Sequence, residues 1–187
     1  MIRSLSRPTA QSLIVPTLFF ALLTATTARI TIPLPFTVVP ITAQTLAVLL
    51  SGLVLGSRAG ALSQLLYLAA ILTGLPLSAA GLGGFVAFLT PTAGYLIAFV
   101  PAAYLAGYVL ERVQGQNRPT LLIHMLASIC GMLVIYVGGV TWLTLMLGNF
   151  QVALQQGLLP FIGVDLAKAI IAALVARGGR LIFPIAQ

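Results

Sequence analysis

Apolar residues run in long, nearly unbroken stretches along this chain, and charged residues fall mostly at the ends of those stretches. A helix that crosses a membrane needs about 20 mostly apolar residues. On this criterion the pattern predicts helices over 8–28, 41–56, 120–147 and 160–177, and two more within 59–110. The sequence therefore predicts an all-α integral membrane protein, a single domain over 1–187 with six transmembrane helices.

Segments rich in proline or glycine separate these helices on one side of the predicted bundle. The first, 32–44, carries three prolines and ends with the polar residues Thr42 and Gln44; the second, 81–95, is rich in glycine. Either segment could border a ligand or be a plain turn, and the residues leave both interpretations open. For the third segment, 148–159, we expect an ordinary loop.

Composition supports the membrane interpretation. Hydrophobic residues make up 60% of the 187 and charged residues 6%, whereas soluble domains carry about 25% charged residues. The apolar content equally excludes a disordered chain. A single cysteine, Cys130, excludes an internal disulfide and a cysteine-clustered metal site, and we expect no metal.

The net charge of +7 predicts an orientation. With six spans, seven of the nine basic residues face the side that holds both termini: Arg3, Arg7, Arg58, Arg112, Arg118, Arg177 and Arg180. Basic residues in short loops mark the cytoplasmic side. We therefore expect a multi-pass protein of the cytoplasmic membrane with both termini inside, no nucleic-acid partner, and a first apolar run that is a span rather than a cleaved signal peptide.

Asp165 and Lys168 form the only acid–base pair within a predicted span. Their i, i+3 spacing places them on one helix face, roughly 8 and 12 Å along the helix from Pro160. Charges at that depth cost several kcal/mol unless they are paired or hydrated. The pair is either a polar anchor for a small ligand, which we favour, or a structural ion pair.

Small residues recur at helical spacing in the first two predicted helices, at Ala21 and Ala25 and at Gly52, Gly56 and Gly60. This spacing lets helices approach closely. The contact is either within the chain, which spacing alone favours, or against a partner.

The chain has no phosphate-binding loop of the Gly-x-x-x-x-Gly-Lys-[Ser/Thr] type. Uphill transport would therefore need energy from another subunit.

The sequence resembles the BioY family, the biotin-binding S components of energy-coupling factor (ECF) transporters. The resemblance covers the chain from about Ala21 to Arg177 and is carried by these motifs: Val39-Pro-Ile-Thr-Ala-Gln44, Gly52-Leu-Val-Leu-Gly56-Ser-Arg-Ala-Gly60, Tyr67, Gly74-Leu-Pro76, Gly83-Gly84, Pro91-Thr-Ala-Gly-Tyr95 and Pro160-Phe-Ile-Gly-Val-Asp165-Leu-Ala-Lys168.

The resemblance implies a six-helix membrane protein that captures biotin from outside, with no cofactor of its own. It implies that Asp165 and Lys168 belong to the biotin site, that the loop before the second helix caps it with Thr42 and Gln44, and that Gly83, Gly84 and Tyr95 belong to a second pocket loop. It further implies that Ala21 and Ala25 face a transmembrane coupling protein, which works with two ATPases. Given this resemblance, we favour the partner interface for the alanine stripe.

One segment departs from the family pattern. Family members usually read Leu-Gly-Pro-x-Gly-Gly-Tyr where this chain has Thr90 and Ala93 in place of two glycines, so no site residue is transferred between 85 and 88.

Three other functions stay open: an S component for another small vitamin, a small membrane-embedded enzyme using Asp165 and Lys168 as acid and base, and a structural assembly subunit. A homo-oligomer also stays open.

Overall fold

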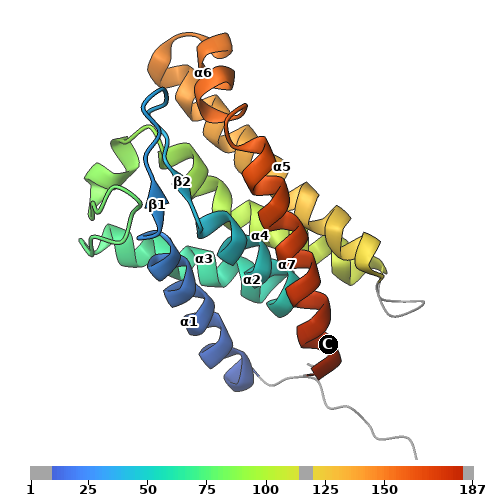
Figure 1. The fold of residues 1–187 in the computed structure, drawn as a ribbon. Helices are drawn as coiled ribbons and strands as arrows, with labels where there is room; N and C mark the ends of the chain where they lie inside the picture. Colours follow the sequence, from blue (N-terminus) through green and yellow to red (C-terminus); the bar gives the residue numbers. More distant parts are fainter. Residues whose placement is uncertain (1–9, 114–119, 183–187) are drawn as a thin grey trace, which may run out of the picture.

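The protein is a bundle of helices with a short β-hairpin at one end (Figure 1). The computed structural model describes residues 10–113 and 120–182. Its elements are α1 (Ala10–Thr27), β1 (Thr31–Ile32), β2 (Ile41–Thr42), α2 (Gln44–Leu55), α3 (Ser57–Leu72), the 3₁₀ helix η1 (Phe85–Leu89), α4 (Ala93–Val113), α5 (Leu121–Leu147), α6 (Phe150–Gly157) and α7 (Ile162–Ile182).

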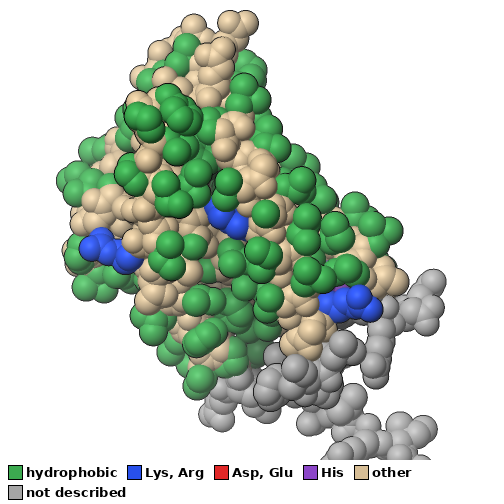
Figure 2. Space-filling model, in the orientation of Figure 1, with side chains coloured by type: hydrophobic (Ala, Val, Ile, Leu, Met, Phe, Trp, Pro, Cys, Tyr) green, Lys and Arg blue, Asp and Glu red, His purple; other side chains and the backbone are tan. Residues whose placement is uncertain are grey.

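The six longer helices correspond to the six predicted apolar runs. Two of them, α4 and α5, are long and apolar enough to cross a membrane, and α6 with α7 qualifies as one span bent by 54°. The other three, α1, α2 and α3, are shorter apolar helices. Large apolar side chains are exposed on the outside of the bundle, for example Val15 at 73% and Leu145 at 75%. Figure 2 shows a largely hydrophobic face with isolated basic side chains, as expected for a surface in contact with lipid.

The two ends of the bundle differ. The start of α1, the end of α4, the start of α5 and the end of α7 lie toward one end, and the β1–β2 hairpin and α6 lie toward the other (Figure 1). The turn between α2 and α3 belongs to the first end, because Ser57 contacts Glu111 in the last turns of α4. The Glu111 carboxylate accepts hydrogen bonds from the Ser57 amide at 2.6 Å and hydroxyl at 2.7 Å. It therefore caps the start of α3, where amides lack partners within the helix.

The glycine stripe of α2 and α3 mediates packing inside the chain. A side chain at Gly52 would meet the backbone of Ala103 on α4, and one at Gly60 would meet Gly52. Gly56 connects the two helices at a φ of 86°, a conformation that favours glycine. Within this chain the stripe therefore brings α2 against both α3 and α4.

The alanine stripe of α1 also faces inward in part. Ala25 is only 5% exposed and belongs to the core, and Ala21 packs against the core while remaining partly exposed. The main packing partners of α1 among the described elements are α2 and α3. Ala25 is thus covered by its own chain, which favours the internal alternative there, whereas a partner interface at Ala21 stays a prediction.

The hairpin is one of two corrections to the predicted elements. Ile41 and Thr42, expected at the start of a helix over 41–56, instead pair antiparallel with Ile32 and Thr31, while the fold as a whole is mostly helical. The prolines lie in the 33–40 loop of this hairpin, where missing amide donors cost no ladder hydrogen bond. Residues 31–42, called the hairpin below, reach toward α6 in Figure 1.

The second correction concerns 148–159, expected to be an ordinary loop. Gly148 ends α5 in the left-handed region at φ 67°. The Asn149 side chain then accepts hydrogen bonds from the Gln151 and Val152 amides at 2.9 and 3.2 Å. An asparagine accepting in this way is a standard N-cap, and it starts α6.

Candidate ligand-binding site

A pocket lies between the hairpin and the bundle, lined mostly by apolar side chains with a few polar groups, as small-molecule sites usually are. Most of the lining comes from four parts of the chain: the hairpin with the start of α2, α4 with Thr92 just before it, α5, and α7 with Phe161 just before it. Ala79 comes from the loop before η1. The lining residues are Val39, Pro40, Thr42, Gln44, Thr45, Ala79, Thr92, Tyr95, Leu96, Phe99, Ile135, Tyr136, Phe161, Asp165 and Lys168.

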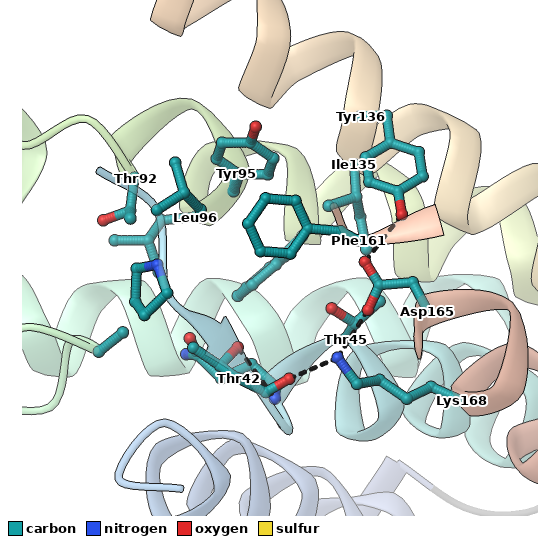
Figure 3. Close-up of a pocket in the computed structure, with 15 residues that line it drawn as sticks. Thr42, Thr45, Thr92, Tyr95, Leu96, Ile135, Tyr136, Phe161, Asp165 and Lys168 are labelled. Atoms are coloured by element: carbon teal, nitrogen blue, oxygen red, sulfur yellow. Dashed lines mark hydrogen bonds and ion pairs between the residues drawn. The ribbon is translucent and has the colours of Figure 1, made fainter. Parts of the chain in front are cut away.

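The polar centre of the pocket is Asp165 (Figure 3). Lys168 forms an ion pair with one of its carboxylate oxygens at 2.6 Å, and the Tyr136 hydroxyl donates to the other at 2.9 Å. Asp165 is only 6% exposed, and a buried charge needs such partners to offset its lost hydration. The i, i+3 spacing on α7 accounts for the ion pair, whereas Tyr136 comes from α5.

Lys168 also connects α7 to the hairpin. Its Nζ donates to the Thr42 carbonyl at 2.7 Å, and Figure 3 shows Lys168 bridging Thr42 and Asp165. An ammonium has three protons; two of them donate to described residues, which leaves a third that a ligand could accept. Thr42, which the resemblance places in the loop that caps the site, contributes its backbone carbonyl to this contact.

Gln44 lies at the start of α2 and is 2% exposed. Its Nε2 donates to the Tyr67 hydroxyl at 2.6 Å, and this hydroxyl donates to the Leu77 carbonyl at 3.0 Å. The chain of hydrogen bonds orients the Gln44 amide and ties the loop after α3 to the pocket.

Tyr95 forms part of the apolar wall. Its hydroxyl donates to the Gly157 carbonyl at the end of α6 at 2.7 Å, and its ring lies directly against Gly139, where a side chain would meet ring atoms. In Figure 3 its hydroxyl points away from Asp165. Tyr95 therefore presents its ring to the pocket, together with Phe99 and Phe161.

Gly83 and Gly84 lie outside the described lining of this pocket. Gly84, at φ 71°, donates its amide to the Ile71 carbonyl at 2.7 Å. A side chain on Gly83 would clash with the backbone at Gly74. Both glycines shape the loop that carries Ala79 into the lining.

The structure thus brings together Thr42, Gln44, Tyr95, Asp165 and Lys168 of the seven predicted site residues. Sequence reasoning does not find Tyr136, because a tyrosine in an apolar run is typical of a packing or interfacial residue. The available signal was indirect: a buried carboxylate requires donors, but nothing in the sequence indicates which donor reaches it across 29 residues.

The arrangement can bind a small molecule that has both a polar and an apolar part. A partnered carboxylate and a lysine proton offer an acceptor and a donor, and aromatic and aliphatic side chains enclose the rest. Among residues 10–113 and 120–182, no group of three His, Cys, Asp or Glu side chains is placed to hold a metal ion.

Fold and pocket together define a helical membrane protein with a small-molecule site at one end of its bundle. Its structure is similar to the crystal structure of an S-component for biotin from an ECF-type ABC transporter, with a TM-score of 0.85 and 26% identity over 94% of this chain and 95% of that chain.

Residues 3–184 match the sequence model of the BioY family, and the chain belongs to this family. Among curated relatives it is 35% identical to the biotin transporter BioY of Rhizobium etli, over 94% of this chain and 96% of that protein. It is 40% identical to the biotin transporter BioY of Rhodobacter capsulatus, over 86% and 88% of the two chains.

Proposed function

We propose that this protein captures biotin and takes it up across the cytoplasmic membrane as the substrate-specific subunit of an ECF-type transporter. The observation that carries the proposal is the Asp165 carboxylate, buried at one end of the bundle and held by Lys168 and Tyr136. The ureido ring of biotin has two N–H donors and one carbonyl acceptor. Asp165 would accept from an N–H, and the third proton of Lys168 would bind the carbonyl.

The apolar part of the ligand fits the rest of the lining. Biotin's fused sulfur-containing ring is compact and mostly apolar, and Phe99, Ile135 and Phe161 supply matching walls. The similarity to named biotin transporters supports the same ligand. Because those relatives are transporters, the comparisons favour transport over the enzyme alternative.

We place all six longer helices across the membrane, with both termini in the cytoplasm. The start of α1 and the end of α7 lie toward the same end of the bundle (Figure 1), which supports placing both termini on one side. The exposed Arg58 and Arg112 at that end support a cytoplasmic location. The pocket would then open toward the outside. A transmembrane coupling protein and two ATPases would supply the energy, with Ala21 within reach of the coupling protein.

The direct test is biotin titration of the purified protein in detergent, comparing the parent with Asp165→Asn and Lys168→Ala. Each variant removes a charge from the pair, and we expect affinity losses of about 100-fold, or about 2.7 kcal/mol. Arg177→Gln is the matched control, because it removes an exposed charge from the same helix. Undiminished affinity in both pocket variants would refute the site, and a parent that binds another vitamin but not biotin would refute the ligand.

A further inference from the structure

The charges that line the pocket cancel. Among its fifteen lining residues only Asp165 and Lys168 carry charge at neutral pH, and they pair with each other at 2.6 Å. Lys168 is additionally bound to the Thr42 carbonyl. The pocket is therefore neutral overall, although it contains both signs of charge.

None of the other described cations is among the lining residues. Arg29 is exposed just after α1, donates to the Pro76 carbonyl at 3.4 Å and lies beside Gly81, in the loop that carries Ala79 into the lining. Arg58 and Arg112 belong to the opposite end of the bundle, beside the contact between Ser57 and Glu111. Arg177 is roughly 13 Å further along α7 than Lys168.

A ligand carboxylate placed beside Asp165 would share one ammonium with a second carboxylate. Two carboxylates competing for one cation in a buried site repel each other, and the excess negative charge loses its hydration. The neutral ureido ring carries no such penalty, because it offers N–H donors to Asp165. The carboxylate of biotin, at the far end of a flexible four-carbon chain, can instead remain in water.

We infer that the pocket recognises the ureido ring and leaves the ligand's carboxylate at the solvent side, so that this protein also binds biotin derivatives whose carboxylate has become an amide. The substrate class is thus ureido-ring compounds with variable tails, including biotin joined through an amide to an amino acid. This inference rests on the proposed function, because it assumes that Asp165 accepts from the ureido N–H.

The test is competition against labelled biotin on the purified parent protein, using biotinamide, biotinyl-lysine and a biotin methylated on its ureido nitrogens. We expect the two amides to bind within about tenfold of biotin and the ureido-methylated compound to bind about 100-fold more weakly. An Arg29→Gln variant should bind biotin like the parent, since Arg29 lies outside the described lining.

Two results would overturn the inference. One is a loss of more than about tenfold for biotinamide while biotin itself binds tightly, which would mean that the carboxylate is held by a cation. The other is weaker binding of biotin, but not of biotinamide, by Arg29→Gln. If neither biotin nor the amides bind, the proposed function itself fails, so the two failures are distinguishable.

Discussion

At the scale of single residues, Tyr136 determines how Asp165 is presented. Lys168 binds one carboxylate oxygen and Tyr136 the other, so the carboxylate is fixed from two helices before a ligand arrives. Fixing a polar group in advance reduces the ordering that binding must impose. Tyr136 is therefore a positioning residue for the polar anchor as well as part of the pocket wall.

Replacing Tyr136 with Phe tests this role. The change removes one hydroxyl from a charged hydrogen bond, whose contribution is about 1.5–3 kcal/mol, so we expect biotin affinity to fall by about 10- to 100-fold. The measurement is the dissociation constant of the purified variant. Tyr104→Phe, at an exposed tyrosine of α4, is the control and should bind like the parent. Parent-like affinity in a folded Tyr136→Phe protein would contradict the role.

At the scale of elements, α6 holds the pocket together. Two neighbouring carbonyls at its C-terminal end accept hydrogen bonds from different parts of the site: Gln156 from the Thr37 hydroxyl at 2.6 Å, and Gly157 from Tyr95. Thr37 lies in the hairpin, and its oxygen also accepts from the Val39 amide at 3.1 Å. The hairpin is thus fastened to α6 over the pocket that Val39 and Pro40 line.

Thr37→Val keeps the side-chain shape and removes this hydrogen bond. Because a neutral hydrogen bond contributes about 0.5–1.5 kcal/mol, we expect biotin to dissociate about 2- to 12-fold faster if the hairpin must open for release. The rate is measured by chasing labelled biotin with an excess of unlabelled biotin. Thr26→Val, which changes an exposed hydroxyl bonded within α1, should leave it unchanged. An unaltered rate in Thr37→Val would show that the hydrogen bond does not restrain release.

At the scale of the whole molecule, the pocket and most of the described basic residues occupy opposite ends. Phe36 is 62% exposed in the hairpin, and Arg112 is exposed near the end of α4. If the positive end faces the cytoplasm, these two positions lie on opposite sides of the membrane. The same orientation would place the pocket on the outer side of the membrane, as uptake requires.

Cysteine labelling tests the orientation, because Cys130 is the only cysteine in the sequence. In a Cys130→Ala background, a cysteine replacing Phe36 should react with a membrane-impermeant maleimide in intact cells. A cysteine replacing Arg112 should react only after the membrane is permeabilised. The Cys130→Ala protein without a new cysteine is the control for background labelling. Labelling of the Arg112 position in intact cells would refute the proposed orientation.

The sequence by itself determined the helices and the polar pair. Long apolar runs bounded by charges predict helices without knowledge of their neighbours, because hydrophobicity and length are local properties. The i, i+3 spacing likewise places Asp165 and Lys168 on one face of α7 before any packing is known. The resemblance to the BioY family then pointed to Thr42, Gln44 and Tyr95, which the structure places in the lining of the same pocket.

Only the tertiary structure decided which groups meet from different helices. The Tyr136 hydroxyl and the Thr42 carbonyl reach the ion pair across 29 and 126 residues, and no local pattern encodes such contacts. Tertiary packing also decides that Ala25 is buried, that Thr37 bonds to α6, and that Gly83 and Gly84 lie outside the described lining. Each depends on how close two segments come in space, and that distance is determined by the packing of the entire bundle.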